Sequence, residues 1–566
     1  MQKSKKIPYE VRNLNNLKEL VYHGADLYRE KTAFMSKTEK GGEYNHISYI
    51  QFKYDVEALA TKLINIGLAD KKIAVIGANS YQWVVSYFAA ICIGVVVPLD
   101  KELSSLEINN LVQRAECDAI FYDNNCVAKV SELDINLKIQ FSDYQNNLEK
   151  DGIYKLINEG KKLLDNGDNS FIEKPLDNTV MAALLFTSGT TGTPKGVMLS
   201  HKNITRVIMS TTMIITPEEG DSVLSVLPIH HTYESTLGIM TPLFAGFRIA
   251  FCEGLKYILK NMKEAQTTYI VGVPIIVETI YSRIWKEAEK TGKAKLLKKV
   301  ISINKKLMSL GIDKRALLFK SVRKNFGGKF RCVICGAAAI NPKVVRGFVD
   351  LGFEICQGYG LTETAPLVAG VPQYEDMYAK AGSCGPHIPE VEIAIDNPDE
   401  DGIGEIKIKG DNVMLGYYDM PEETEKVLKN GWFYSGDLGF IDKDGWLYLT
   451  GRNKNIIVTK TGKNIYPEEI EIIINDIKYV SDSMVYGIKD EQSEEFYTAV
   501  QIYPNYEEIK ESYGDLDKDG VYNLFKELLY DINKEMPSYK RIRKIIIRED
   551  DFIRTTTKKI KRNENI

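Results

Sequence analysis

The chain has 566 residues, of which 44% are hydrophobic and 27% charged, and its formal net charge is −4. This length allows about three or four domain-sized units, and the composition is ordinary for a globular protein. The balanced charge gives no reason to expect nucleic acid as a partner. Eight cysteines and an N-terminus without an apolar leader predict a cytoplasmic protein.

The first clear elements lie in an uncharged stretch from Ile73 to Leu99. A membrane-spanning helix needs about 20 apolar residues, but glycine, asparagine, serine and proline interrupt this stretch near both ends. We therefore predict a βαβ unit with buried parallel strands instead of a membrane span. Its elements are a strand over residues 73–77, a helix over 81–93 with Ser80 as its N-cap, and a strand over 95–99.

Apolar strand-like runs alternate with helical patterns through most of the first 450 residues. This alternation predicts an α/β fold with mainly parallel sheets. The expected strands are residues 119–122, 180–186, 222–227, 248–251, 269–273 and 332–334.

The sequence pattern changes near Gly402, where short runs of alternating apolar and polar residues are separated by Asp-Gly and Gly turns. That pattern predicts a small antiparallel β subdomain. The remainder, after Gly451, reads as a small α+β domain, so we place the domain boundary between residues 451 and 452. The expected elements are strands over 455–459, 483–488 and 497–503, helices over 467–476 and 522–536, and a strand near Ile545.

The only close cysteine pair, Cys332 and Cys335, lies in an apolar run, FRCVICGAAAI. A second CxxC or suitably spaced histidines would be needed to complete a metal site, and the sequence offers neither. We therefore interpret the pair as part of a buried strand.

The strongest functional signal is LLFTSGTTGTPKGVML, residues 184–199. A strand leads into a loop of small and hydroxylated residues, whose backbone N–H groups can converge on phosphate oxygens. It is not a Walker A loop, because Pro194 stands before the lysine. The candidate phosphate ligands are Thr187, Ser188, Gly189, Thr190, Thr191, Gly192 and Lys195.

This segment resembles the phosphate loop of the adenylate-forming (AMP-binding) superfamily, and the later motifs follow in the family's order across nearly the whole chain. The sequence is most similar to the bacterial long-chain fatty acyl-CoA synthetases. The resemblance implies a large N-terminal domain, made of two α/β subdomains and a small antiparallel β subdomain, and a small, mobile α+β C-terminal domain. It also implies ATP, Mg²⁺ and coenzyme A as ligands.

Two motifs match the family's adenine site. Gly336-Ala337-Ala338 resembles the wall of the adenine pocket, and residues 358–364, GYGLTET, follow at the expected distance. The resemblance implies that Tyr359 stacks on adenine beside Gly360, that Thr362 approaches the α-phosphate, and that Glu363 holds Mg²⁺, with Thr190 as a second ligand. Carboxylate oxygen suits this hard cation.

The remaining family motifs lie towards the C-terminus. The resemblance assigns ribose to Asp437 of YSGD, ribose or phosphate to Arg452, and the domain hinge to Lys454. Lys559 matches the catalytic lysine, whose charge would offset the negative charge of the adenylation transition state. The family has glycine before this lysine; here Lys558 stands there, so either lysine could reach the site. Gly462 resembles the residue that borders the pantetheine tunnel.

The segment LPIHHTYE, residues 227–234, resembles the mouth of the acyl pocket. The family histidine corresponds to His231, which we interpret as lining the pocket and not as a metal ligand. Some long-chain enzymes carry a tryptophan gate four residues later, but here that position is Ser235. We therefore predict no such gate.

Two segments are strongly basic. Residues 283–329 contain fifteen Lys or Arg against three Asp or Glu, and residues 540–562 contain ten against three. The first reads either as a solvated helical face or as a contact with an anionic membrane surface, which would place the protein at the inner membrane face. The second reads as an edge facing the phosphates of a nucleotide or of coenzyme A.

These features predict an enzyme that activates a fatty acid as acyl-adenylate and transfers the acyl group to coenzyme A. One alternative is a fatty acyl-AMP ligase or acyl carrier protein synthetase, which uses another acceptor. A luciferase-like oxygenase and a nucleotide- or lipid-binding protein without catalysis are further alternatives. The sequence gives neither the acyl chain length nor the oligomeric state.

Overall fold

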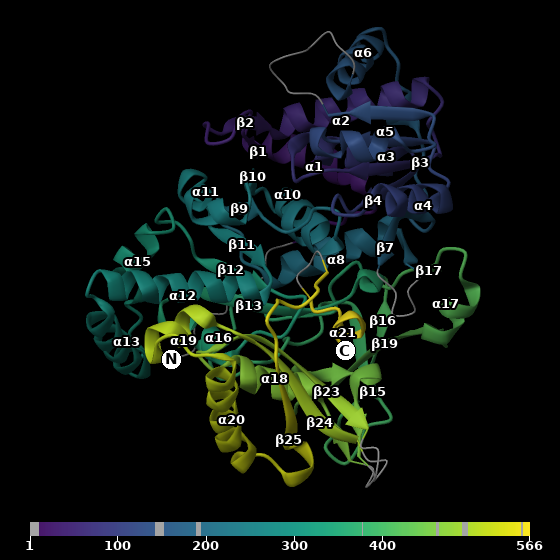
Figure 1. Cartoon of the computed structure of the whole chain (residues 1–566). Coiled ribbons are helices and arrows are strands. Elements are labelled where there is room, and N and C mark those ends of the chain that lie inside the picture. Colours follow the sequence, from purple (N-terminus) through teal and green to yellow (C-terminus); the bar gives the residue numbers. More distant parts are fainter. Residues whose placement is uncertain are drawn as a thin grey trace. The chain divides into compact units, whose positions relative to one another are not determined.

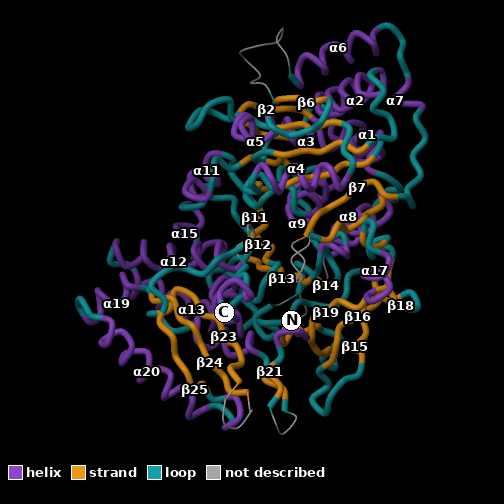
Figure 2. The backbone as a smooth tube through the Cα atoms, turned by 45° about the vertical axis from the view of Figure 1, so that its right-hand side comes forward, coloured by secondary structure: helices purple, strands orange, loops and turns teal. Residues whose placement is uncertain are grey.

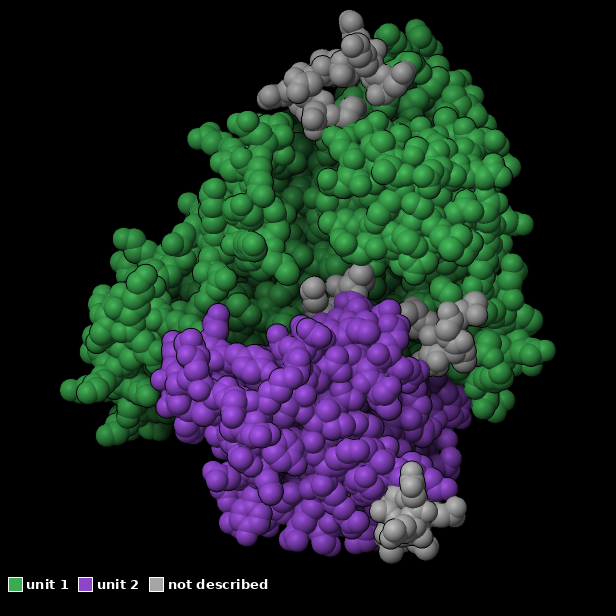
Figure 3. Space-filling model, viewed as in Figure 1, with its two compact units in different colours: residues 1–393, 408–433 green, residues 394–407, 434–566 purple. Residues whose placement is uncertain are grey.

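A computed structural model describes residues 11–141, 152–187, 194–375, 377–459, 463–489, 496–555 and 559–566. The chain forms two compact units (Figure 3). The larger unit comprises Met1–Ile393 and Ile408–Phe433, and the smaller comprises Ala394–Lys407 and Tyr434–Ile566.

One sheet of the larger unit has the strand order β17-β8-β7-β4-β3-β5-β6 among the described residues. Strands β7, β4, β3, β5 and β6 pair in parallel, whereas β7, β8 and β17 pair antiparallel. The strands are β3 (Lys72–Ile76), β4 (Val95–Leu99), β5 (Ala119–Tyr122), β6 (Leu137–Gln140), β7 (Met181–Thr187), β8 (Lys195–Ser200) and β17 (Gly416–Tyr417).

The predicted βαβ unit is confirmed. Helix α3 (Tyr81–Ile93) connects the parallel strands β3 and β4, and the Ser80 side chain accepts a hydrogen bond from the N–H of Trp83. Nearly every residue of α3 is buried, which explains why its sequence is apolar on all sides. None of the helices in the described part of the chain combines the length and apolar character that a membrane crossing requires.

The second sheet of the larger unit has the order β14-β13-β12-β11-β9-β10-β1-β2 within the described residues. Its central strands are parallel, and β2 and β14 are antiparallel edges. The strands are β1 (Thr32–Ser36), β2 (Asn45–Ser48), β9 (Ser222–Ser225), β10 (Arg248–Phe251), β11 (Tyr269–Gly272), β12 (Cys332–Cys335), β13 (Glu354–Tyr359) and β14 (Ala369–Gly370). Cys332 and Cys335 are buried in β12, as predicted, and neither forms a disulfide.

Helices cover both sheets. Figure 1 shows α3 beside β3, α2 beside α3, and α12 beside β12. The principal helices are α1 (Leu17–Tyr28), α2 (Tyr49–Asn65), α4 (Ser105–Ala115), α6 (Ile153–Asp165), α8 (His201–Ile214), α10 (Thr241–Ala245), α11 (Ile258–Glu264), α12 (Pro274–Lys290), α13 (Ala294–Ser309), α16 (Pro342–Asp350) and α17 (Pro421–Val427). Together with the sheets they confirm two α/β layers in the larger unit.

The smaller unit contains the predicted antiparallel pair and the predicted α+β fold. Strand β19 (Trp432–Ile441) pairs antiparallel with β20 (Leu447–Arg452). In Figure 2, β23, β24 and β25 lie side by side, and β25 runs parallel to β24. The further elements are β21 (Ile457–Val458), β22 (Asn464–Ile465), α18 (Pro467–Asn475), β23 (Val480–Lys489), β24 (Phe496–Pro504), α19 (Tyr506–Tyr513), α20 (Lys518–Glu535) and β25 (Ile542–Ile547).

Helix α19 is not among the predicted elements. Of its eight residues only Ile509 is buried, so it lacks the apolar stripe by which a helix is recognised in a sequence. The helix is nevertheless capped, because the Asn505 side chain accepts a hydrogen bond from the N–H of Glu508.

Candidate active site

The predicted phosphate loop connects two antiparallel strands. Thr187 is the last residue of β7 and Lys195 the first of β8, and the two are direct partners in the ladder. The Thr187 hydroxyl donates to the Lys195 carbonyl at 3.4 Å, so the two ends of the loop lie together. The loop residues Ser188, Gly189, Thr190, Thr191 and Gly192 lie outside the described residues, and their roles stay predictions.

Among the described residues, two side chains of the larger unit lie against the ammonium group of Lys195. Its Nζ lies 2.6 Å from Glu423 Oε2, on α17, and 4.8 Å from the centre of the Tyr417 ring, on β17. Hydrogen bonding to Lys195 and Lys426 lowers the pKa of Glu423 to about 2. The lysine charge is therefore balanced by a carboxylate and by the face of an aromatic ring.

Tyr417 also holds the predicted magnesium ligand. Its hydroxyl donates to Glu363 Oε1 at 2.9 Å. Glu363 lies in the short 3₁₀ turn Thr362–Thr364, and its carbonyl accepts from the N–H of Met414 at 2.8 Å. Burial and the neighbouring Glu363 carboxylate raise the pKa of Tyr417. One tyrosine thus contacts both Lys195, through its ring, and Glu363, through its hydroxyl.

This arrangement suits Mg²⁺ bound together with phosphate. Mg²⁺ in nucleotide sites takes one or two carboxylates plus substrate phosphates, so a full cage of protein ligands is not needed. Glu363 supplies one such carboxylate. No group of three or more His, Cys, Asp or Glu side chains gathers at a metal-binding distance within the described residues.

The predicted adenine residues lie at the carboxyl ends of neighbouring strands. Gly336 follows β12 and Tyr359 ends β13, and these two strands are parallel neighbours. In open α/β sheets, this edge is where ligands bind. Tyr359 is 6% exposed, and its stacking on adenine stays a prediction.

Two backbone features restrict this edge. A Cβ atom on Gly360 would lie 1.6 Å from the Pro366 carbonyl oxygen, so only glycine fits there. Ala337 has a φ of +69°, a left-handed conformation that a residue with a side chain rarely adopts. Strain of this kind gathers at functional sites. Ala338 follows as an exposed residue, and Thr362 stands beside Glu363.

The two histidines follow β9. The rings of His230 and His231 are 4.2 Å apart, and His230 Nε2 lies 3.6 Å from Asp100 Oδ2. Burial lowers the pKa of His230 to about 3, so its imidazole is neutral at physiological pH. Because Asp100 directly follows β4, this contact joins loops from the two sheets of the larger unit. His231 precedes the short helix α9 (Thr232–Glu234).

A buried polar network fixes the loop that carries these histidines. The Asn79 amide group donates to Ser225 Oγ at 2.8 Å and to the Leu227 carbonyl at 2.7 Å, and its oxygen accepts from the N–H of Ile229. Ser225 in turn donates to Glu234 Oε1 at 2.5 Å. Sequence reasoning gave these three residues no role: Glu234 ends the LPIHHTYE segment without an assignment, and no motif points to Asn79 or Ser225.

An apolar cavity lies between α8, α10 and the second sheet of the larger unit. It is small, because the space that a water-sized sphere can occupy inside it is only about 20 Å³. It is lined by Thr211, Ile215, Val223, Leu237, Thr241, Pro242, Phe247, Tyr269, Val271 and Ile334. The hydroxyls of Thr211 and Thr241 are buried there without a hydrogen-bond partner among the described residues.

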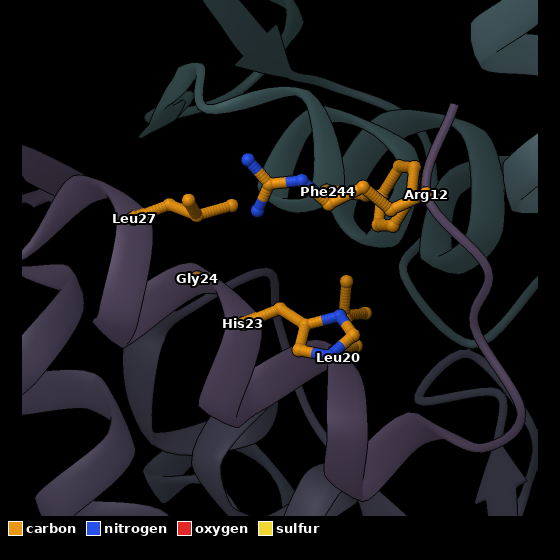
Figure 4. Close-up of a pocket in the computed structure, with 6 residues that line it drawn as sticks. All are labelled: Arg12, Leu20, His23, Gly24, Leu27 and Phe244. Carbon is orange, nitrogen blue, oxygen red and sulfur yellow. The ribbon is translucent and has the colours of Figure 1, made fainter. Parts of the chain in front are cut away.

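A second cavity contains none of the predicted site residues. Figure 4 shows His23, on α1, facing Phe244, on α10, with the Arg12 guanidinium above. Leu20, Gly24 and Leu27 complete the lining, and a water-sized sphere has only about 10 Å³ of room inside.

In the smaller unit, Asp437 and Arg452 are neighbours. They are partners in the β19–β20 ladder, and Arg452 Nε lies 2.8 Å from Asp437 Oδ1. Asp437 is buried, and Arg452 is exposed. A carboxylate held in this way can accept hydrogen bonds from two hydroxyl groups, as the ribose assignment requires.

Lys559 stands on an anchored hairpin of the smaller unit. Its N–H donates to Thr555 Oγ1 at 3.1 Å, and its carbonyl accepts from the Thr555 N–H at 2.8 Å. On one side Arg554 pairs with Asp482 at 2.8 Å, and on the other Arg562 pairs with Glu471 at 2.7 Å. Lys559 is exposed; Lys558 and Gly462 lie outside the described residues.

Comparison with known families shows to which family the chain belongs. A family model described as "AMP-binding enzyme" matches residues 21–418, and one described as "AMP-binding enzyme C-terminal domain" matches residues 454–566. The chain belongs to the AMP-binding enzyme family. The phosphate-loop ends, Glu363 and His231 lie within the first match, and Lys559 within the second.

Curated relatives of this AMP-binding enzyme include fatty acid ligases. The chain is 28% identical over 509 residues to the chicken long-chain-fatty-acid–CoA ligase ACSBG2, covering 83% of this chain but only 65% of the relative. It is 27% identical to an Arabidopsis chloroplastic long-chain-fatty-acid–[acyl-carrier-protein] ligase, AEE15, over 91% of this chain and 81% of that protein. It is 26% identical to Mycobacterium tuberculosis FadD15, a long-chain-fatty-acid–CoA ligase, over 79% and 76%.

Solved structures agree on the fold of the AMP-binding enzyme. ATP-bound MatB from Rhodopseudomonas palustris superposes with a TM-score of 0.74 at 24% identity, covering 97% of this chain and 98% of that one. MenE from Bacillus subtilis, in complex with ATP and magnesium ion, gives 0.73 at 20% identity, with coverage of 96% and 98%. The predicted adenylate-forming fold is confirmed.

Proposed function

We propose that the protein is an ATP-dependent, AMP-forming ligase that activates a long-chain fatty acid and transfers the acyl group to coenzyme A. The observation that carries this proposal is the contact of Tyr417 with both Lys195 and Glu363, beside the ends of the Gly/Thr loop. An ammonium group and a carboxylate held together at such a loop suit Mg·ATP. The names of the curated relatives support the fatty acid and the thiol acceptor.

In the proposed first step, a carboxylate oxygen of the acid attacks the α-phosphorus of ATP. The bond from that phosphorus to the bridging oxygen breaks, and pyrophosphate leaves. Positioning and charge neutralisation do most of the work in such a transfer. Lys195 and the loop would hold the phosphates, and Lys559 would lie between the two reacting anions. Mg²⁺, bound through Glu363, would neutralise phosphate charge.

In the proposed second step, a thiol attacks the acyl carbon of the adenylate, and AMP leaves. Asp437 and Arg452 would keep the ribose in place, while Gly462 would border the thiol's path. We also propose that residues 1–451 and 452–566 act as the two domains and that rotation about Lys454 exchanges Lys559 for the Gly462 face. Such domain motions often limit turnover.

The apolar cavity between α8, α10 and the sheet is the proposed acyl site, and it would have to widen to hold a hydrocarbon chain. Its lining is aliphatic and aromatic apart from hydroxyl groups, as a hydrocarbon chain requires. His231 would stand at its entrance, where the carboxylate meets ATP.

The test is pyrophosphate release from ATP with straight-chain acids from about C2 to about C20, each with coenzyme A, with acyl carrier protein, or with neither. We expect an optimum among the long chains and formation of acyl-CoA. Pyrophosphate release with transfer only to carrier protein would favour the alternative acceptor, to which the Arabidopsis relative points. No release with any acid would contradict the proposal.

A further inference from the structure

Helix α13 presents an apolar stripe to solvent. Leu296, Ile303 and Leu310, which caps the helix, are 59%, 43% and 73% exposed. They are seven residues apart, which is close to two helical turns, so they line up along one side of the helix. Exposed aliphatic side chains are common singly, but a continuous row indicates a binding surface.

The orientation of α13 is fixed from its other side. Leu297 and Asn304, also seven residues apart, are 9% and 3% exposed and face the protein. Lys305 Nζ pairs with Asp350 Oδ2 at 3.0 Å and lies 3.0 Å from the Tyr378 hydroxyl. Figures 1 and 2 both show α13 next to α12 in the larger unit. The exposed row is therefore a property of a well-packed helix.

Lysines run beside the apolar row. Lys295, Lys299 and Lys306 are exposed and follow each other at helical spacing. Within the part of the chain that the structure describes, none of them has an acidic partner within 4.0 Å. The positive charge of this face is therefore directed to solvent.

Exposed apolar side chains and basic residues continue in the segments next to α13. Leu317, on α14 (Arg315–Leu318), is 71% exposed, and Ile312 is 42% exposed. Residues 283–329 hold fifteen basic and three acidic residues, and one of these acids, Asp313, is paired with Arg315. The surface is thus apolar and cationic at once, as in helices that lie in a membrane interface.

The residue types distinguish a bilayer from a protein partner. Protein interfaces are depleted in lysine, and their strongest contacts come from Trp, Tyr and Arg. Here the exposed row is Leu and Ile, and the cations beside it are lysines, which attract anionic lipid headgroups without fixed geometry.

We propose that the α13 surface, comprising Leu296, Ile303, Leu310, Lys295, Lys299 and Lys306, docks the protein on an anionic lipid bilayer. The apolar row enters the headgroup region, and the lysines contact the negative surface. This inference does not depend on the proposed ligase activity.

The test is co-sedimentation of the full chain with vesicles of phosphatidylcholine alone or mixed with phosphatidylglycerol. We expect binding to the anionic vesicles only, weakening as salt rises. The triple variant Lys295→Glu, Lys299→Glu and Lys306→Glu should bind about 100-fold more weakly. The triple variant Leu296→Ser, Ile303→Ser and Leu310→Ser should also lose binding, because the apolar anchor is gone.

A matched control carries the same charge change on another exposed helix. The variant Lys518→Glu, Lys526→Glu and Lys534→Glu alters α20 and should bind vesicles like the wild type. Circular dichroism establishes that all three variants are folded. Equal binding by the α13 and α20 variants would overturn the proposal. So would a wild type that ignores vesicles but binds an acidic carrier protein through these lysines.

Discussion

At the scale of single residues, Glu234 is the most unusual side chain of the site. It is completely buried, accepts a hydrogen bond from Ser225, and has no partner for Oε2 among the described residues. Burial raises its pKa to about 8. The carboxyl group is therefore protonated at neutral pH in the folded protein, whereas in the unfolded chain it ionises near its ordinary value of 4.5.

This difference in the pKa of Glu234 predicts a pH-dependent loss of folding stability. Between pH 4.5 and pH 8 the folded protein binds the extra proton, so stability falls as pH rises through this window. At about 1.4 kcal/mol for each pKa unit, the cost reaches a few kcal/mol at the upper end. Glu234→Gln should remove this slope, so its stability relative to wild type should increase from pH 4.5 to pH 8. Thermal unfolding midpoints across that range measure it.

The control is Glu289→Gln, on the exposed side of α12, which should leave the slope unchanged. If Glu234→Gln kept the wild-type slope, the carboxyl group would be ionised in the folded protein. That result would require a cationic partner for Glu234 that the described contacts do not contain.

The residue scale also shows how far the sequence could predict the site. Lys195, Glu363 and His231 could be proposed as site residues because each stands in a local motif. Tyr417 could not, since its contacts with Lys195 and Glu363 depend on β17 pairing with β8, more than 200 residues earlier in the chain. Likewise, Asn79 joins Ser225 and Leu227 only because the two sheets meet.

At the scale of elements, the β8–β17 pair makes a prediction about metal binding. Tyr417→Phe keeps the ring over Lys195 but removes the hydrogen bond to Glu363. Loss of a partner that orients a metal ligand typically lowers metal affinity about 10- to 100-fold. We expect the Mg²⁺ concentration for half-maximal pyrophosphate exchange to rise accordingly.

The neighbouring Tyr418 gives a matched control. Its hydroxyl accepts from Lys72 Nζ at 2.6 Å and does not contact Glu363. Tyr418→Phe should therefore leave the Mg²⁺ dependence unchanged. If both variants shifted it equally, the effect would come from the strand and not from the orientation of Glu363.

The cavity between α8, α10 and the sheet allows a second prediction at this scale. The Thr241 hydroxyl is buried without a partner, so Thr241→Val should raise stability by about 1 kcal/mol. If a hydrocarbon chain occupies the cavity, the same change should also lower KM for long-chain acids, with KM for ATP unchanged. Acid-dependent pyrophosphate release measures both constants.

Thr267 separates these two effects. Its hydroxyl is also buried without a described partner, but Thr267 does not line the cavity. Thr267→Val should therefore stabilise the protein without changing KM for any acid. An unchanged KM in Thr241→Val as well would place the acyl chain elsewhere.

At the scale of the whole molecule, most of the architecture could be predicted from periodicity and turn residues. The βαβ unit over residues 72–99 and the sheet of the smaller unit are both confirmed. Helix α19 could not be predicted, because burying only Ile509 leaves no pattern. The two compact units are not continuous in sequence. The chain enters the smaller unit at Ala394–Lys407, goes back to the larger unit over Ile408–Phe433, and then completes the smaller unit. Local sequence patterns carry no information about such a crossing between units.

The division into two units leads to the last prediction. The hairpin that carries Lys559 is fixed within the smaller unit by the ion pairs of Arg554 and Arg562. A cation that acts only while carboxylate and phosphate approach each other is needed for adenylation but not for attack by the thiol. Lys559→Ala should therefore slow acyl-adenylate formation about 100-fold or more, yet leave thioester formation from supplied acyl-adenylate nearly unchanged. Lys558→Ala is the control and should affect neither half-reaction. Equal losses in both half-reactions for Lys559→Ala would mean that this lysine supports the structure of the smaller unit, and a larger loss in Lys558→Ala would transfer the catalytic role to its neighbour.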